Sequence, residues 1–217
     1  MNRATEPDPD SPTIRELLAE ATALLDSESP RLDAEVLLAH ALQQPRSHLL
    51  AWPEKHLTGA QHAAFRQLLQ RRCNGEPVAY LTGEREFWSL SLGVTTDTLI
   101  PRPETETLVA LALERIPADS PQLIADLGTG SGAIALAIAR ERPRCRVIAT
   151  ERAPAALAVA EENARRLGIT TVSFQRGSWC EPLGSLQADL IVSNPPYIAA
   201  ADPHLSRGDV RFEPRGA

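Results

Sequence analysis

Two segments of the 217-residue chain combine residue types that could bind and activate a ligand. The first reads Asp-Leu-Gly-Thr-Gly-Ser-Gly over residues 126–132, with glycines at every second position. Glycines spaced in this way let the backbone turn sharply and let a ligand lie against the main chain, and a helix that begins near Ser131 would point its N-terminus at that ligand. Glu151 follows about 20 residues later, where an acid commonly accepts hydrogen bonds from ribose hydroxyls. We interpret this pattern as a site for a ligand that contains a nucleoside.

The glycine loop by itself leaves the identity of that ligand open. Gly128, Gly130 and Ala133 loosely satisfy the Gly-x-Gly-x-x-Gly/Ala fingerprint of nicotinamide dinucleotide sites. Asp126, immediately before the loop, would repel a pyrophosphate but would suit the cationic groups of S-adenosylmethionine. A third interpretation is that the glycines serve a tight turn between a strand and a helix and bind nothing.

The second segment reads Asn194-Pro195-Pro196-Tyr197 and follows an expected strand over residues 189–193. Ligands of open parallel sheets bind at the carboxyl ends of the strands, so this segment should face the same crevice as the glycine loop. Prolines have no backbone N–H, so their carbonyls act as acceptors, and Asn194 adds a side-chain carbonyl. Tyr197 offers a flat ring for stacking. This combination suits a planar primary amide or an exocyclic amine.

An amide nitrogen is a poor nucleophile because its lone pair is delocalised, as the rotation barrier of roughly 18–20 kcal/mol shows. Two acceptors that hold both of its hydrogens move electron density onto the nitrogen, and a fixed orientation aims the lone pair at a methyl carbon. Holding donor and acceptor in line can supply on the order of 7–11 kcal/mol of the barrier. The alternative is that the segment is a rigid loop after a strand.

The elements that would position these segments fall into two groups. The first group predicts a small helical bundle, with helices over residues 13–27, 30–41, 47–52 and 58–72. Thr13 with Glu16, and Thr58 with Gln61, have the spacing of capping boxes. The apolar stripe predicted for the second helix consists of Leu32, Val36, Leu37 and Ala41.

The second group alternates strands with helices. A hairpin is expected over residues 86–94, strands over 123–127, 146–150, 171–174 and 189–193, and helices over 105–115, 133–142 and 154–167. This alternation predicts an α/β fold with a parallel sheet that carries helices on both faces. We therefore divide the chain into a tail (1–12), a helical domain (13–75), a hairpin and linker (76–104) and a ligand-binding domain (105–217).

Composition limits the possible partners. Hydrophobic residues make up 43% and charged residues 23% of the chain, as in ordinary globular proteins. The net charge of −6 argues against non-specific binding of nucleic acid. The longest apolar run, residues 133–139, is short of the roughly 20 residues that cross a membrane, and no secretory signal is visible at the N-terminus, so we expect a cytoplasmic protein. The spacings of the cysteines and histidines predict no metal site.

Taken together, the sequence resembles class I S-adenosylmethionine-dependent methyltransferases, and within them the HemK/PrmC family of protein-(glutamine-N5) methyltransferases. The resemblance rests on DLGTGSG, NPPYI, GEPVAYLTGEREFW, LIPRPETE and GDVRFEP. It implies a Rossmann-like methyltransferase sheet preceded by a small helical bundle. It also implies a substrate, the glutamine of the Gly-Gly-Gln tripeptide in peptide chain release factors, with the helical domain recognising the release factor.

The resemblance further implies roles for individual residues. S-adenosylmethionine would contact Gly128, Thr129, Gly130, Ser131, Gly132, Glu151, Trp179 and Asn194, with Trp179 near the adenine. Asn194, Pro195, Pro196 and Tyr197 would hold the glutamine side chain, and Asn194, Pro195 and Tyr197 would be catalytic. Two residues depart from the family pattern: Glu151 replaces the commoner aspartate, and Ser178 stands where an acid is usual. The second departure leaves the hydrogen bond to the adenine undecided.

Two other functions remain open. N6-adenine methyltransferases of DNA or RNA share the Asn-Pro-Pro-Tyr segment, although the acidic chain lacks a basic target-reading segment.

The family sheet has strand order 3-2-1-4-5-7-6, of which this chain supplies strands one to four, leaving residues 190–193 as an exposed apolar edge that natural proteins avoid. We therefore expect a fragment that keeps cofactor binding rather than sustained catalysis, and a non-catalytic binding fragment is the third possibility. A dehydrogenase is disfavoured because Asn-Pro-Pro-Tyr has no role in hydride transfer.

Overall fold

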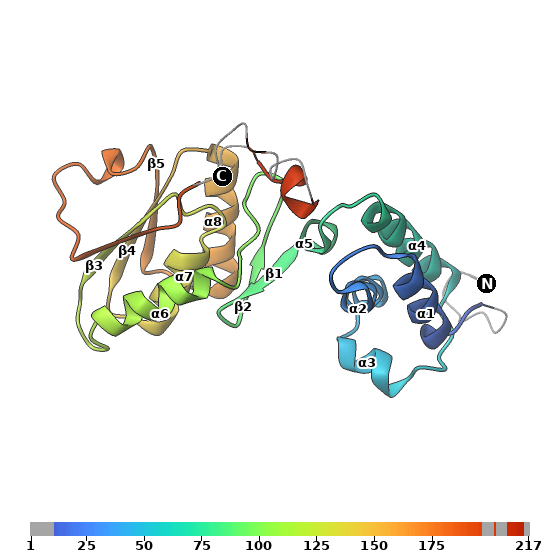
Figure 1. Cartoon of the computed structure of the whole chain (residues 1–217). Coiled ribbons are helices and arrows are strands. Elements are labelled where there is room, and N and C mark those ends of the chain that lie inside the picture. Colours follow the sequence, from blue (N-terminus) through green and yellow to red (C-terminus); the bar gives the residue numbers. More distant parts are fainter. Residues whose placement is uncertain (1–10, 197–201, 203–207, 215–217) are drawn as a thin grey trace. The chain divides into compact units, whose positions relative to one another are not determined.

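The computed structural model describes residues 11–196, 202 and 208–214 (Figure 1). Tyr197 and nearly all of the predicted tail lie outside the described residues. The chain divides into two compact units, Met1–Thr82 and Gly83–Ala217.

The first unit is helical, as the hydrophobic periodicity predicts. It contains α1 (Ile14–Leu24), α2 (Pro30–Leu42), α3 (Arg46–Ala51), α4 (Gly59–Cys73) and α5 (Val78–Thr82). Both predicted capping boxes are confirmed: the side chains of Thr13 and Thr58 accept from the N–H groups of Glu16 and Gln61, which bond back to the cap residues. The caps satisfy N–H groups that each helix start leaves open, which explains why α1 and α4 begin where the sequence indicates.

The core of this unit is formed by one face of each of the longer helices, with Leu17, Leu37 and Phe65 fully buried. The predicted stripe of α2 is wrong at Leu32, whose surface is 43% exposed. The buried residues of α2 include Ala34 and Leu38, and at about 100° per residue Leu32 lies on the opposite side of the helix from Ala34. The short helix α5 was not predicted.

The second unit begins with the predicted hairpin, β1 (Glu84–Phe87) and β2 (Leu90–Gly93), whose strands pair antiparallel. Its two turn residues, Trp88 and Ser89, have φ values of 50° and 57°. Positive φ at both positions gives the turn a twist that matches the twist of the strands. The Trp88 N–H donates to Glu106 at 2.8 Å and its indole N–H donates to Glu141 at 3.0 Å, so the hairpin is tied to the helices that follow.

The remaining elements form the α/β part of the unit. They are α6 (Thr105–Arg115), β3 (Leu123–Leu127), α7 (Ala133–Glu141), β4 (Arg146–Glu151), α8 (Pro154–Leu167), β5 (Val172–Arg176), the 3-10 turn η1 (Glu181–Leu183), β6 (Leu190–Ser193) and the 3-10 turn η3 (Gly208–Phe212). The four strands β3 to β6 pair in parallel in the order β5-β4-β3-β6. This arrangement confirms the predicted fold class and the order 3-2-1-4.

The expectation of helices on both faces of the sheet is wrong for the described residues. Helices α6, α7 and α8 pack on one face, around Ile124, Val147 and Val192 (Figure 1). Parallel crossovers are right-handed, so α7 and α8, which lead to strands on the same side of β3, lie on the same face. After β5 the chain crosses to the other side of β3, where it forms β6 parallel to the other strands. This connection carries only η1, whose Leu183 belongs to the same buried cluster as Leu127.

Strand β6 lies at the edge of the sheet and pairs only with β3 among the described strands. Residue Ile191 of this strand is 52% exposed, so the predicted exposed apolar edge is confirmed. Within the described ranges no helix is long and apolar enough to span a bilayer, and no cluster of acids, histidines and cysteines could hold a metal ion.

Candidate active site

A cavity of about 250 Å³ opens at the carboxyl ends of the four parallel strands. Its lining is contributed by the residues that follow β3, β4, β5 and β6, together with the segment after the hairpin and Pro214. The lining residues are Asp97, Thr98, Leu99, Leu127, Gly128, Gly130, Glu151, Arg152, Ala153, Ala156, Gly177, Ser178, Trp179, Asn194, Pro195, Pro196 and Pro214. The crevice thus lies where open parallel sheets bind their ligands.

The glycine loop approaches this cavity through bare main chain. Gly128 and Gly130 have φ values of 74° and 56°, which disfavour any residue with a side chain. A Cβ atom built on either residue would meet no atom within 4 Å, so open space lies beside both. The N–H of Gly128 donates to the Thr150 carbonyl at 2.9 Å, which fixes the loop to the end of β4. These two glycines therefore fit a ligand that lies against the backbone.

Gly132 serves a different purpose from the other two glycines. A Cβ atom there would lie 3.0 Å from a methyl carbon of Leu136 and 3.2 Å from the Cβ of Ala160. This glycine lets the start of α7 pack closely against α8. Gly132 does not line the cavity, and neither do Thr129 and Ser131, both of which are buried. Of the predicted loop contacts, the structure places only Gly128 and Gly130 at the cavity.

Asp126 is fully buried and does not line the cavity, so its carboxylate is not placed beside a bound ligand as the sequence suggested. The Thr129 hydroxyl donates to its Oδ2 at 2.6 Å. Burial raises the pKa of Asp126 to about 6, against the opposing effect of the hydrogen bonds from the Thr129 hydroxyl and the Ala135 N–H. The side chain acts within the loop, between the end of β3 and the start of α7.

Glu151, the last residue of β4, lines the cavity with an oriented carboxylate. Its Oε1 accepts the N–H of Ala153 at 2.9 Å and its Oε2 accepts the N–H of Gly130 at 3.1 Å. A carboxylate has about four lone-pair sites, so two backbone bonds leave capacity for ligand hydroxyls. The same acid thus joins the glycine loop to the end of β4 and presents its remaining lone pairs to the cavity.

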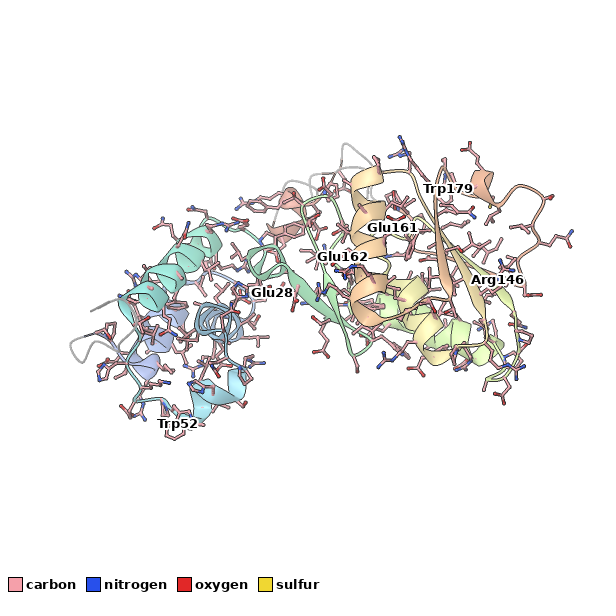
Figure 2. The ribbon with its side chains drawn as sticks, turned by 180° about the vertical axis from the view of Figure 1, so that it is seen from behind. Glu28, Trp52, Arg146, Glu161, Glu162 and Trp179 are labelled. Carbon is pink, nitrogen blue, oxygen red and sulfur yellow. The ribbon has the colours of Figure 1, made fainter. Side chains whose placement is uncertain are left out.

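Trp179 follows β5 and forms a flat wall of the cavity, with 57% of its surface exposed (Figure 2). Its φ of 50° is unusual for a bulky residue. The Thr150 hydroxyl donates to its carbonyl at 3.0 Å, which holds this backbone in place beside β4. An exposed indole on the wall of a cavity can stack on a planar base.

Asn194 and the two prolines line the cavity from the end of β6. The Ser193 hydroxyl donates to the Leu127 carbonyl at 2.8 Å and ties the ends of β6 and β3 together. The side-chain N–H₂ of Asn194 donates to the Thr105 hydroxyl at 3.4 Å. Asn194, Pro195 and Pro196 therefore share one cavity with Gly128 and Gly130, as the position of both segments after parallel strands predicts.

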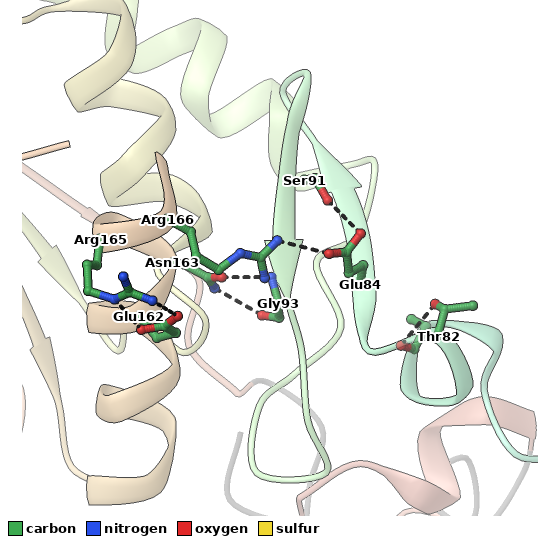
Figure 3. A network of polar contacts seen from close by, with 9 residues as sticks. Thr82, Glu84, Ser91, Gly93, Glu162, Asn163, Arg165 and Arg166 are labelled. Carbon is green, nitrogen blue, oxygen red and sulfur yellow. Dashed lines mark hydrogen bonds and ion pairs between the residues drawn. The ribbon is translucent and has the colours of Figure 1, made fainter. Parts of the chain in front are cut away.

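Asn163 of α8 joins the hairpin to the glycine loop. Its Oδ1 accepts the Gly93 N–H at 2.7 Å, and its Nδ2 donates to the carbonyls of Gly93 and Ser131 at 3.0 and 2.9 Å. Figure 3 shows this buried contact beside the more exposed ion pair of Arg166 with Glu84. Asn163 therefore links the end of β2, which precedes the Asp97–Leu99 lining segment, to the glycine loop.

Several lining residues were not predicted. Residues 97–99 line the cavity from the segment that follows the hairpin, and Pro214 lines it from the chain after β6. Pro214 directly follows Glu213, whose carboxylate oxygens accept from the Arg102 guanidinium at 2.6 and 2.7 Å. The Glu213 side chain is only 2% exposed, and burial raises its pKa, partly offset by Arg102. Leu99 and Arg102 belong to LIPRPETE, and Glu213 and Pro214 belong to GDVRFEP, two of the stretches on which the family resemblance rests. Asp97 and Thr98 precede the first of these stretches.

Two protein families match separate parts of the chain. The PrmC N-terminal domain matches residues 16–83, and the methyltransferase small domain matches residues 105–207. The first match covers the five helices of the first unit apart from the start of α1, and the second covers the strands and helices that surround the cavity.

Curated proteins match almost the whole chain. A release factor glutamine methyltransferase of Salmonella typhimurium is 55% identical over 194 residues, which are 89% of this chain and 70% of that protein. The proteins of the same name from Vibrio cholerae and Escherichia coli are 54% and 52% identical, over 95% and 93% of this chain and 73% and 71% of their own length. With this sequence identity, and with Asn194, Pro195 and Pro196 lining the same cavity as the glycine loop, the chain belongs to the family of release factor glutamine methyltransferases.

Proposed function

We propose that this chain transfers a methyl group from S-adenosylmethionine to the side-chain amide nitrogen of the glutamine in the Gly-Gly-Gln tripeptide of a peptide chain release factor. The observation that carries the proposal is that Gly128 and Gly130 line the same cavity as Asn194, Pro195 and Pro196. One cavity can therefore hold a methyl donor and an amide acceptor side by side. S-adenosylmethionine, when bound, supplies an electrophilic methyl group.

The cofactor side of the cavity would be formed by four residues. Gly128 and Gly130 offer bare backbone with open space beside it, and Glu151 offers the remaining lone pairs of its carboxylate to the ribose hydroxyls. Trp179 offers an exposed ring to the adenine. Thr129, Ser131 and Gly132 do not line the cavity and would instead stabilise the conformation of the loop.

The substrate side would be formed by the Asn194 side-chain carbonyl and the carbonyls of the two prolines. These acceptors hold both hydrogens of the glutamine amide, which moves electron density toward its nitrogen and fixes the direction of its lone pair. When the nitrogen gains its new bond it loses one of these protons to solvent, because amide carbonyls accept hydrogen bonds but are too weakly basic to keep a proton. Positioning of this kind can account for roughly 7–11 kcal/mol of the barrier. The ring of Tyr197, which follows the described segment, would stack on the amide plane.

The two units would have different roles, one in binding the release factor and the other in methyl transfer. The helical domain (13–75) would contact the release factor, the hairpin and linker (76–104) would join it to the methyltransferase domain, and residues 105–217 would carry the reaction. Leu50 and Trp52, near and just after the end of α3, expose 72% and 60% of their surface and would offer an apolar contact to a protein partner. Figure 2 labels Trp52 on this unit. A release factor acts in translation, so the reaction would take place in the cytoplasm, without a metal and without direct nucleic-acid binding.

The test is to incubate the chain with methyl-labelled S-adenosylmethionine and a purified release factor, and to locate the label by peptide mass. We expect the label on the glutamine of Gly-Gly-Gln, and none on a release factor in which that glutamine is replaced by alanine. Label in duplex DNA or RNA instead would support an N6-adenine methyltransferase. Calorimetric binding of cofactor and release factor without any turnover would identify a binding fragment.

A further inference from the structure

Thr150 of β4 contacts two walls of the cavity, although it does not line the cavity itself. Its backbone carbonyl accepts the N–H groups of Gly128 and Thr129 at 2.9 and 3.0 Å, which ties the glycine loop to the strand. Its side-chain hydroxyl donates to the carbonyl of Trp179 at 3.0 Å. The glycine loop and the indole wall are therefore held by the same residue, which is fully buried.

The bond to Trp179 is made where the pairing of β4 with β5 has already ended. Thr150 pairs with Gln175, and the next pair, Glu151 with Arg176, is the last. A strand that ran straight on would carry residue 179 roughly 13 Å beyond Gln175, at about 3.3 Å per residue. The 3.0 Å bond shows that the chain instead turns back over the end of β4. The Thr150 hydroxyl thus fixes a segment that strand pairing no longer fixes.

This anchor matters because the backbone of Trp179 is in an unfavourable conformation. Its φ of 50° lies in the left-handed region, where a side chain crowds the backbone. Such a conformation persists only when the surrounding contacts hold it. A backbone carbonyl can only accept a hydrogen bond, so a donor is needed at position 150. Loss of that donor would let the backbone relax and would turn the indole away from its place on the cavity wall.

We propose that Thr150 is a positioning residue for S-adenosylmethionine, whose hydroxyl keeps the Trp179 indole in place against the adenosine part of a cofactor that lies on the glycine loop. The inference rests on the proposed function in one respect, the stacking of Trp179 on the adenine. Thr150 itself touches no ligand, so its effect on cofactor binding should depend on the presence of the Trp179 ring.

The decisive variants are Thr150→Val, which keeps the shape of the side chain but has no donor, and Thr150→Ser, which keeps the hydroxyl. By calorimetry we expect Thr150→Val to raise the dissociation constant for S-adenosylmethionine by about five- to tenfold, the effect of one lost hydrogen bond. Thr150→Ser should stay within about twofold of the unaltered chain. Thr22→Val is the matched control, because in the first unit the Thr22 hydroxyl donates to the backbone carbonyl of Leu18 at 2.6 Å. It should leave the dissociation constant unchanged.

A double-mutant cycle with Trp179→Ala separates this role from a general loosening of the fold. Trp179→Ala should itself weaken cofactor binding. In its background Thr150→Val should change the dissociation constant by no more than about twofold, because the ring through which Thr150 acts is gone. A purely structural role would raise the dissociation constant by the same factor in both backgrounds and would overturn the proposal. Undiminished binding in Trp179→Ala would overturn it as well.

A third measurement needs no ligand. The chain has three tryptophans, Trp52, Trp88 and Trp179, so labelling with 5-fluorotryptophan gives three ¹⁹F signals, and the Trp179 signal is the one lost in Trp179→Ala. We expect Thr150→Val, but neither Thr150→Ser nor Thr22→Val, to shift that signal. Either an unmoved Trp179 signal or an unchanged dissociation constant in Thr150→Val would overturn the role of Thr150. Failure of the unaltered chain to methylate any release factor would overturn the proposed function alone, because cofactor binding and the Trp179 signal are measured without the methyl acceptor.

Discussion

At the scale of single residues, the glycine loop separates binding from support. Gly128 and Gly130 face open space in the cavity, whereas a Cβ atom on Gly132 would lie 3.0 Å from Leu136 of α7 and 3.2 Å from Ala160 of α8. All three have positive φ, so backbone freedom alone does not distinguish them. What distinguishes them is the atom that a side chain would meet: nothing at the first two positions, and the packed side chains of two helices at the third.

Gly130→Val should abolish cofactor binding, because its side chain would enter the cavity. Gly168→Val is the matched control, since Gly168 has a φ of 67° and open space beside it, but lies at the end of α8 and does not line the cavity. Both variants should lose roughly 1–2 kcal/mol of unfolding free energy from the left-handed backbone. Calorimetry with S-adenosylmethionine should show lost affinity for Gly130→Val alone. Normal affinity in that variant would refute the assignment of the loop.

Asn194→Ala tests the acceptor at the end of β6. We expect the dissociation constant for S-adenosylmethionine to change little and kcat to fall by about 10² or more, the range seen when a preorganised polar contact to the reacting group is removed. Single-turnover methylation of a release factor gives the rate. A rate equal to that of the unaltered chain would remove Asn194 from the mechanism.

Asp126 predicts a pH dependence of stability. Its pKa is raised from 3.8 to about 6 by burial, so the folded state binds a proton between pH 4 and pH 6 that the unfolded state releases. The unfolding free energy from this group is therefore highest below pH 4 and decreases as the pH rises to 6. In Asp126→Asn this loss is absent. In urea unfolding measured from pH 4 to pH 7, the unfolding free energy of the variant should rise by about 3 kcal/mol relative to that of the original chain. A difference between the two chains that does not change with pH would contradict the raised pKa of Asp126.

At the scale of elements, the cavity depends on how the hairpin is joined to the sheet. Asn163 makes three hydrogen bonds between α8, β2 and the glycine loop, and a Cβ on Gly93 would lie 3.0 Å from its Oδ1. Gly93 is thus required where the amide approaches the strand. The ion pair of Arg166 with Glu84 joins the same two elements but is largely solvent-exposed.

Asn163→Ala should therefore cost far more than Arg166→Ala, although both remove a link between α8 and the hairpin. The first variant leaves three backbone groups without partners, for which we expect a loss of roughly 2–4 kcal/mol in unfolding free energy. The second removes an exposed ion pair, worth about 0–1 kcal/mol. Urea denaturation of both variants measures the two losses. Equal losses would show that the buried amide does not hold the hairpin.

At the scale of the whole molecule, two matched families correspond to two compact units, and the division after Thr82 falls at the end of the first match. Within the second unit, residues far apart in sequence close the cavity together. Arg102, before α6, binds Glu213, which lies 111 residues later and directly precedes the lining residue Pro214. This long-range pair connects the entry to the sheet with the chain that follows β6.

The Arg102–Glu213 pair should be strongly coupled. Arg102→Leu leaves the Glu213 carboxylate buried without its cation, so we expect a loss on the order of 2 kcal/mol and a further rise in the Glu213 pKa. Glu213→Leu added to Arg102→Leu should recover part of that loss, because no buried carboxylate then remains. A double-mutant cycle of unfolding free energies measures the coupling, and additive losses would contradict it.

The sequence by itself determined the local elements and the two chemical segments. Hydrophobic periodicity, capping boxes and the alternation of strands with helices are short-range patterns, so α1, α4, α8 and the parallel sheet follow from them, as does the placement of residues 128–130 and 194–196 after neighbouring strands. Only the tertiary structure decided which loop residues reach the cavity, because Thr129, Ser131 and Gly132 differ from Gly128 in what packs around them rather than in spacing. It also decided the burial of Asp126, the contact of Thr105 with Asn194 and the single helical face of the sheet. Each of these depends on contacts between residues distant along the chain, or on the direction of a crossover, which no local pattern specifies.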